Sequence, residues 1–444
     1  MCAVALRLRL EALTVYYPKR RVMLSFPTPQ RTMVLCGLLT VALMFHAFVN
    51  ILLPRIPEST SNKWRYVDSI PVGKSVGVDF KTFRNASQEM VSGKSPYNAS
   101  FQSPPFTALV FYPLTLTPEN TAYRIQLFLL SACNIASLVL LACLMQRASS
   151  IVVGEASSVI PLVLITVSVL QFLGYPFEFS LERGNYDAFA LFFIVMGLWF
   201  AAQNRKNLWL PVLFFSVATH LKVYSGIFFV IPLWQHRQRA MIPLVLTNVA
   251  MLFVFGAKRV LEFSNGLRQF SLHPYFWMGN HSAASFADQF FGRFLLTASD
   301  KRVHLVAMTL LLGIPIAIWL HGSIRLIRRG FDVQAMLLWA ALSTPIMCIT
   351  TPVSHDYRLI ICALPTIICL IYFANNFVYR GSRLDFIATV GTLVPAVLIA
   401  RSIMYSPILW GNKYPVLILL EICAYLAVCM KTSVSFPQET EISS

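Results

Sequence analysis

Long apolar runs follow one another along this chain from Met33 to Met430, and they limit what it can fold into. A membrane-spanning helix needs about 20 mostly apolar residues, and most of the runs approach that length. Of the 444 residues, 57% are hydrophobic and 12% are charged. Soluble domains carry roughly 25% charged residues and cannot bury this much apolar surface in one core. The sequence therefore indicates a polytopic membrane protein and excludes the soluble, disordered and fibrous classes.

The runs predict an all-α membrane domain of about 12 segments. They lie at 33–53, 120–145, 157–176, 186–202, 211–234, 241–256, 303–321, 333–351, 359–378, 386–404 and 415–430. Two long polar stretches, 54–119 and 257–302, interrupt the series, and we expect the first of them to carry interfacial helices. The predicted organisation is a basic tail over 1–32, a membrane domain over 33–430 and a polar tail over 431–444.

Basic residues in the short connections predict the orientation, because such residues favour the cytosolic side. They are Arg205, Lys206, Arg237, Arg239, Arg325, Arg328, Arg329, Arg380 and Arg383. Both tails then lie in the cytosol, and both long polar stretches face the outside of the cell inner (plasma) membrane. Only the run 211–234 separates two of these basic connections. Either this run is a hairpin of two short helices with Lys222 near its outer tip, or it is one span with a misplaced loop.

The formal net charge of +17 indicates contact with anionic lipid headgroups, so we expect the bilayer and no nucleic acid as a partner. The patterns GxxxxGK[ST], GxGxxG, HExxH and GxSxG do not occur, which leaves ATP-driven transport, dinucleotide chemistry, and zinc or serine hydrolysis without support. The nine cysteines include no CxxC pair, so buried free thiols are expected. No cofactor and no metal ligand is predicted.

Ionisable residues at the ends of apolar runs are functional candidates, because a charge within a membrane is costly. The first is Asp79, at the start of a predicted interfacial helix with apolar residues at Phe80 and Met90. It is either the N-cap of that helix or a reactive carboxylate. The second is the segment 178–187, which holds three carboxylates and one arginine. It is either a charged rim that anchors a helix or a turn that positions reactive groups.

Three further candidates combine basic and polar side chains. Lys222 interrupts an apolar run, so it either snorkels to the interface or binds an anion such as phosphate. Asn280 and His281 lie in an aromatic-rich outer stretch. His355 and Arg358 directly precede a span, and such a pair at a membrane boundary can bind phosphate. An ordinary loop histidine is the alternative for both histidines.

The order of several short motifs is more informative than any one of them. They are Gly-x-x-Pro-Tyr at 93–97, Ser-Pro-Pro-Phe at 103–106, Tyr-Pro-Leu at 112–114, Arg-Gly-Asn-Tyr-Asp-Ala at 183–188, Lys-x-Tyr at 222–224, Gly-Asn-His-Ser at 279–282 and Pro-Val-Ser-His-Asp-Tyr at 352–357. Together with the preceding outer-loop aspartate, this order resembles the GT-C superfamily of membrane glycosyltransferases, and most of all glycosyltransferase family 87. That family includes bacterial mannosyltransferases that depend on polyprenyl-phosphate-mannose.

The resemblance implies a hexosyltransferase, most simply a mannosyltransferase, that uses a polyprenyl-phosphate sugar on the outer (periplasmic) face and needs no cofactor. Its acceptor would be a lipid-linked or glycan hydroxyl. Asp79 would be the base, with Glu178 or Glu182 as the alternative, and the anomeric centre would be inverted. The resemblance places Lys222 and His355 at the donor phosphate. We predict that Arg358 and Arg183 bind the same phosphate, and that the substrate-binding residues are Tyr97, Asn185, Asp187, Asn280 and His281.

A transporter or flippase of lipid-linked sugars is the alternative, because it would share the helices, the basic groups and a cavity. Transporters usually consist of two matching halves with paired broken helices and a site at the midplane. The sequence shows no such halves, and its candidate residues gather on one face. This arrangement favours an enzyme with one-sided chemistry.

Overall fold

The computed structural model describes residues 77–98, 101–153, 159–203, 207–272, 279–294, 301–401 and 412–430. The predicted tails, 1–32 and 431–444, and the predicted first span, 33–53, lie outside these residues. Within the described residues every regular element is a helix, and the β-type pairing is one isolated bridge between Asn280 and His355. The predicted all-α fold is confirmed for this part of the chain.

The helices follow the apolar runs of the sequence closely. The α-helices are α3 (Val78–Val91), α4 (Pro105–Phe111), α5 (Glu119–Val153), α6 (Val159–Phe172), α7 (Tyr175–Arg183), α8 (Asp187–Gln203), α9 (Trp209–Leu221), α10 (Val230–His236), α11 (Met241–Leu252), α12 (Ala257–Leu272), α13 (Ala283–Phe294), α14 (Lys301–Arg329), α15 (Val333–Thr350), α16 (Ala363–Arg380), α17 (Arg383–Ala400) and α19 (Tyr414–Cys429). The 3-10 helices are η3 (Pro96–Asn98), η4 (Tyr112–Leu116), η5 (Val223–Phe229), η6 (Arg237–Ala240) and η7 (Asp356–Cys362).

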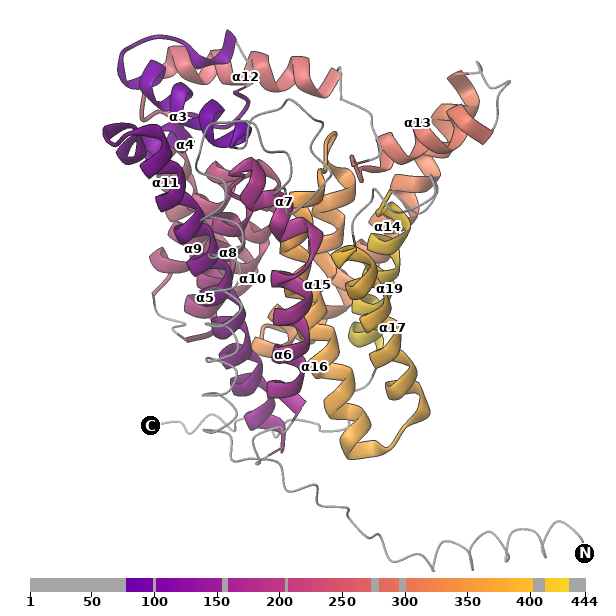
Figure 1. Ribbon diagram of the computed structural model, residues 1–444. Coiled ribbons are helices and arrows are strands. Elements are labelled where there is room, and N and C mark those ends of the chain that lie inside the picture. Colours follow the sequence, from indigo (N-terminus) through magenta and orange to yellow (C-terminus); the bar gives the residue numbers. More distant parts are fainter. Residues whose placement is uncertain are drawn as a thin grey trace, which may run out of the picture.

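The long helices run side by side as one bundle, with α3, α4 and α12 gathered at one end (Figure 1). Five helices of the described residues are long and apolar enough to cross a membrane, and counting each of two bent helix pairs as one span gives seven. The predicted count of about 12 segments is therefore not confirmed within this part of the chain. The shorter apolar helices α8, α9 and α19 also belong to the bundle.

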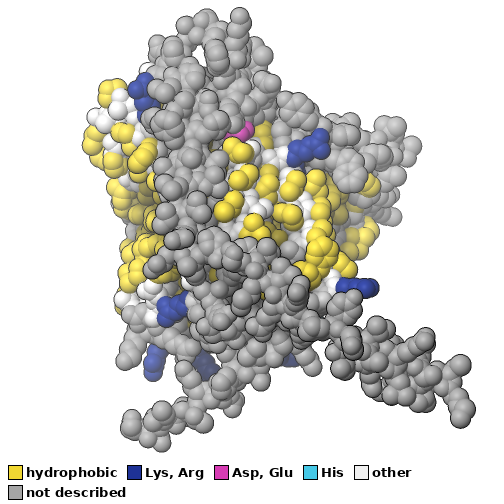
Figure 2. All heavy atoms as spheres, turned by 60° about the horizontal axis from the view of Figure 1, so that its bottom comes forward, with side chains coloured by type: hydrophobic (Ala, Val, Ile, Leu, Met, Phe, Trp, Pro, Cys, Tyr) yellow, Lys and Arg dark blue, Asp and Glu magenta, His cyan; other side chains and the backbone are white. Residues whose placement is uncertain are grey.

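Burial divides the bundle into a protein-covered centre and an apolar exterior. Helices α15 and α16 are apolar and largely buried, as expected for helices surrounded by others. Helix α17 instead exposes large apolar side chains such as Phe386, Ile387 and Val394. Figure 2 shows broad apolar areas in yellow with Lys and Arg in dark blue near their margins. An apolar exterior of this kind suits contact with lipid tails.

The chain turns back at Lys222, between α9 and η5. Lys222 lies beside Asp187, at the start of α8. Gln235, which is 13 residues later, donates a hydrogen bond of 3.0 Å from its side-chain amide to the carbonyl of Ala201, near the end of α8. The segment after Lys222 therefore returns along α8 to its other end. This is the geometry of the hairpin interpretation rather than of a single span.

Candidate active site

The turn between α7 and α8 organises the candidate site. Helix α7 ends at Arg183, and its C-cap Gly184 adopts the left-handed conformation with φ of 67°. Helix α8 begins three residues later, at Asp187. Arg183, Asn185 and Asp187 therefore project from one short turn. The structure thus contains a turn that positions polar groups rather than a loose charged rim.

Glycine at position 184 lets α3 approach this turn closely. A Cβ atom on Gly184 would lie 2.6 Å from the Cβ atom of Phe80, which is closer than two such atoms can come. The backbone N–H of Gly77 donates a 2.8 Å hydrogen bond to the carbonyl of Glu182, which fixes the start of α3 against the end of α7. This contact brings Asp79 to the turn.

Gly184→Ala should therefore destabilise the protein by more than the backbone strain of an alanine in the left-handed conformation. The strained backbone costs about 1–2 kcal/mol, and overpacking against Phe80 adds about 1–3 kcal/mol. Gly381→Ala is the matched control, because Gly381 is also left-handed, with φ of 63°, but has open space around it. Thermal unfolding in detergent should show a clearly lower midpoint for Gly184→Ala. Equal midpoints would contradict the close approach of α3.

Asp79 binds the turn instead of capping its own helix. The N-cap of α3 is Gly77, and no side chain caps this end. The alternative prediction of an N-cap aspartate is therefore wrong, because the carboxylate points away from the helix N-terminus toward α7. Its Oδ1 atom accepts a 2.6 Å hydrogen bond from the guanidinium of Arg183, and its Oδ2 atom accepts one of 2.9 Å from the side-chain amide of Asn185.

Lys222 meets the same turn from the hairpin. Its Nζ atom lies 2.7 Å from the carboxylate of Asp187 and donates a 3.0 Å hydrogen bond to Oδ1 of Asn185. The ammonium also lies 4.2 Å from the centre of the Tyr186 ring, at the distance of a cation–π contact. The snorkelling interpretation is therefore wrong, since this lysine points into the protein toward an acidic partner.

Arg358 joins the cluster through Tyr224, and it also binds Thr351. The hydroxyl of Tyr224 donates to the carboxylate of Asp187, and the guanidinium of Arg358 lies 4.3 Å from the centre of the Tyr224 ring. One nitrogen of Arg358 donates to the hydroxyl of Thr351. The ring of Tyr357 lies 5.4 Å from the Lys222 ammonium. Aromatic rings thus contact both cations, in addition to the ion pair between Lys222 and Asp187.

His355 borders this cluster as a neutral group. Burial, together with the positive charge of Arg358, lowers the pKa of His355 to about 4. Its imidazole is therefore uncharged at neutral pH in the structure described here, and it contacts the ring of Tyr357 at 5.4 Å. It can exchange hydrogen bonds with a phosphate but does not supply a positive charge to attract one.

The cluster contains more donor capacity than its own acceptors use. Three cations, Arg183, Lys222 and Arg358, accompany the carboxylates of Asp79 and Asp187. The Nε–H groups of Arg183 and Arg358 are buried, and neither has a hydrogen-bond partner among the described residues. Buried donors in proteins are almost always paired, and two open guanidinium donors in one cluster can bind an anion.

Asn280 and His281 lie apart from this cluster, in a buried hydrogen-bond network. Nδ1 of His281 accepts a hydrogen bond from the backbone N–H of Lys413, so its Nε2–H donates to Asp356 at 2.9 Å. The side-chain oxygen of Asn280 accepts from the backbone N–H of Ser354 at 2.8 Å. These bonds fix the segment that leads to His355 and Arg358. The prediction that Asn280 and His281 contact substrate stays a prediction.

Tyr97 also lies apart, and Glu182 is buried beside the cluster. The hydroxyl of Tyr97 donates a 3.0 Å hydrogen bond to the carbonyl of Ser103, and its ring contacts Phe101. Glu182 is 1% exposed, and its backbone carbonyl also accepts from the hydroxyl of Tyr123. The structure thus brings together Asp79, Arg183, Asn185, Asp187, Lys222 and Arg358, with His355 at their edge.

The tyrosines of the cluster have no role predicted from the sequence. Tyr224 and Tyr357 belong to the Lys-x-Tyr and Pro-Val-Ser-His-Asp-Tyr motifs, which predict no function for either ring. The spacing Lys-x-Tyr could have indicated a role for Tyr224. In an extended or turning segment, this spacing places the side chains of Lys222 and Tyr224 on the same side of the chain. A group of three or more residues able to hold a metal ion is absent from the described part of the chain.

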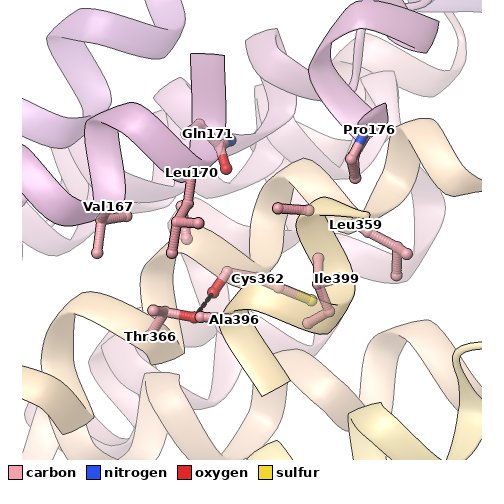
Figure 3. A pocket seen from close by; sticks show the side chains of 11 residues that line it. Val167, Leu170, Gln171, Pro176, Leu359, Cys362, Thr366, Ala396 and Ile399 are labelled. Carbon is pink, nitrogen blue, oxygen red and sulfur yellow. Dashed lines mark hydrogen bonds between the residues drawn. The ribbon is translucent and has the colours of Figure 1, made fainter. Parts of the chain in front are cut away.

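A small apolar pocket lies near the cluster but is not part of it. Its lining comes from α6, the start of α7, η7, α16 and α17, and Figure 3 shows Leu359 and Cys362 of η7 facing it. In a 3-10 helix, residues three apart share a face, so these two lie on a different side of η7 from Arg358. The lining contains no charged residue.

Comparison with known protein families identifies the family of this chain. The model of glycosyltransferase family 87 matches residues 101–352, which is more than half of the 444 residues. No curated protein matches the chain. Several residues of the cluster lie outside the matched segment, because Asp79 precedes it and His355 and Arg358 follow it. The extent of the match is sufficient to establish that this chain belongs to glycosyltransferase family 87.

Proposed function

We propose that the protein transfers a hexose from a polyprenyl-phosphate sugar to a hydroxyl of a lipid-linked or glycan acceptor, on the outer face of the membrane. The observation that carries this proposal is the open donor capacity of Arg183 and Arg358 next to Lys222. A sugar linked to phosphate is the donor that such a cluster recognises. Mannose is proposed from the resemblance to mannosyltransferases of the family.

Asp79 is the proposed base. Each of its oxygens accepts one hydrogen bond from the turn, which leaves a second lone pair on each for an incoming hydroxyl. Its side chain is 13% exposed, whereas that of Asp187 is fully buried. Asp79 is therefore the carboxylate of this pair that a substrate can reach. The acceptor hydroxyl gives its proton to Asp79 as its oxygen attacks the anomeric carbon.

Lys222, Arg358 and Arg183 are the proposed stabilisers of the leaving group. When the bond between the anomeric carbon and the phosphate oxygen breaks, its electron pair leaves with the polyprenyl phosphate. The phosphate gains negative charge in that step, so fixed cations beside it stabilise the transition state more than the bound donor. Two arginines and a lysine suit a phosphate group, which accepts several hydrogen bonds at once.

Inversion of the anomeric centre is proposed from the same geometry. Retention requires a second carboxylate as a nucleophile beside the reacting carbon. Asp187 is committed to Lys222 and Tyr224, and Glu182 is buried at 1% exposure. With Asp79 as the one partly exposed carboxylate of these three, a single displacement by the acceptor is the simpler course.

The outer face is proposed from the placement of basic residues. Lys413 donates from Nζ to the carbonyl of Leu398, so the end of α17 lies near the cluster side of the bundle. Arg383, at the start of α17, therefore lies at the opposite end. Arg383 belongs to a short connection rich in basic residues, which favours the cytosol. The cluster then faces the outside of the cell. A polyprenyl-phosphate sugar suits this side, because its use requires no nucleotide.

Purified protein should transfer radiolabelled mannose from polyprenyl-phosphate-mannose to lipid extracts of the host membrane. The product should be extractable into organic solvent or recovered in a glycan fraction, and it should carry the inverted anomeric configuration by NMR. Asp79→Asn in the same preparation is the negative control. Movement of intact donor across a vesicle membrane without transfer would instead support the transporter. Transfer with retention would contradict the single displacement.

A further inference from the structure

Helix α12 lies across the end of the bundle that carries α3 and α4, at 91° to the preceding helical segment (Figure 1). The carboxylate of Glu262 accepts hydrogen bonds from the hydroxyl of Ser95 at 2.8 Å and from the guanidinium of Arg259 at 2.6 Å. A second nitrogen of Arg259 donates to the carbonyl of Gly93. We call Arg259, Glu262 and these two partners the α12 latch. It fastens α12 to the segment 93–97.

Contacts continue from the latch to the candidate site. The ring of Tyr97 contacts the ring of Phe263 on α12, with centres 6.1 Å apart. The hydroxyl of Tyr97 donates to the backbone carbonyl of Ser103 at 3.0 Å, and the hydroxyl of Ser103 is hydrogen bonded to that of Tyr186. The ring of Tyr186 then lies 4.2 Å from the Lys222 ammonium. Every step is a direct contact between described residues.

The latch is more than an exposed surface ion pair. Exposed pairs contribute little to stability because water screens them. The side chain of Arg259 is only 9% exposed, and its second bond goes to a backbone carbonyl. A guanidinium that binds a carboxylate and a carbonyl at once fixes the relative position of two segments. The latch thereby fixes the segment 93–97, and Tyr97 and Ser103 connect this segment to the hydroxyl of Tyr186.

We propose that Arg259 and Glu262 are positioning residues for the donor-phosphate site, acting on Lys222 through Tyr97, Ser103 and Tyr186. The contact between ring and ammonium depends on distance, so a shift of Tyr186 changes where the Lys222 charge lies. This inference rests on the proposed function only for its kinetic consequence. The position of Lys222 itself can be measured without any substrate.

The test compares Arg259→Met with Arg268→Met, which removes an exposed arginine from the same helix. Intact protein in detergent is treated with acetic anhydride, and acetylation of Lys222 is followed by mass spectrometry, with exposed Lys258 as the internal reference. We expect acetylation of Lys222 to be at least ~5-fold faster in Arg259→Met, and the donor KM to rise about 5- to 20-fold, which lies at the lower end of the coupling typical of linked sites. Arg259→Lys, which keeps a charge, should recover part of both effects.

A double variant separates positioning from general destabilisation. In a Lys222→Met background, Arg259→Met should no longer change the donor KM, because its target is gone. Unchanged acetylation of Lys222 in Arg259→Met, or an unchanged KM increase in the double variant, would overturn the positioning role. Faster acetylation in a protein that transfers no sugar would leave the positioning role intact and overturn the proposed function.

Discussion

Asp79→Asn should lower kcat by at least ~10²-fold, the usual contribution of a general base. Asparagine keeps the size of aspartate and can still accept a hydrogen bond from Arg183, but its amide cannot take a proton from the acceptor. The donor KM should change much less, because the proposed phosphate residues are untouched. Steady-state transfer assays over a range of donor concentrations separate the two constants.

Glu182→Gln is the control for this assignment. Glu182 lies three residues from Asn185 in the chain but is buried at 1% exposure, so it should not receive a proton from an acceptor. Its replacement should leave kcat within a few-fold of the wild type if the protein remains folded. An active Asp79→Asn enzyme beside an inactive Glu182→Gln enzyme would show that the base had been assigned to the wrong carboxylate.

Lys222→Met should cause two separable losses. Removing one partner of a buried ion pair costs about 3–5 kcal/mol of stability, because the carboxylate of Asp187 stays buried without its cation. Removing a donor that stabilises the leaving phosphate should also lower kcat by about 10²-fold and raise the donor KM. The double variant Lys222→Met/Asp187→Asn removes both charges, so it should regain thermal stability without regaining activity.

Lys81→Met is the matched control for loss of a lysine. Lys81 pairs with Glu119 at 3.2 Å, but both side chains are more than 40% exposed, so its loss should change stability by at most ~1 kcal/mol. Unfolding midpoints and transfer kinetics should be measured on the wild type, Lys222→Met, Lys222→Met/Asp187→Asn and Lys81→Met. Recovery of full activity in Lys222→Met/Asp187→Asn would rule out Lys222 as a phosphate ligand.

The sequence was sufficient to predict most helices, because long apolar runs have few alternatives in a membrane. The run 333–351 corresponds to α15, Val333–Thr350, and the run 386–404 to α17, Arg383–Ala400. The conflict among basic connections was sufficient to suggest a reversal near Lys222. These predictions succeeded because each depends on a local pattern or on the order of segments.

The contacts of the candidate site could not be predicted in the same way. Asp79 and Asn185 are 106 positions apart, and no local pattern states that a carboxylate at one helix start meets an amide in a distant turn. Spacing alone favoured Asp79 as a cap, since it cannot show that Gly77 takes that position. The sequence also does not show that Asn280 and His281 make hydrogen bonds to backbone and to Asp356, and their contact with substrate stays a prediction.

The amide of Asn185 gives the candidate site a direction before any substrate arrives. Its nitrogen faces the carboxylate of Asp79 and its oxygen faces the ammonium of Lys222. Rotating the amide by half a turn would set oxygen against carboxylate and nitrogen against ammonium, so both contacts would become repulsive. The amide therefore has one stable orientation for as long as both neighbours are charged. In the proposed reaction, the acceptor therefore binds on the Asp79 side of Asn185, and the donor phosphate binds on its Lys222 side.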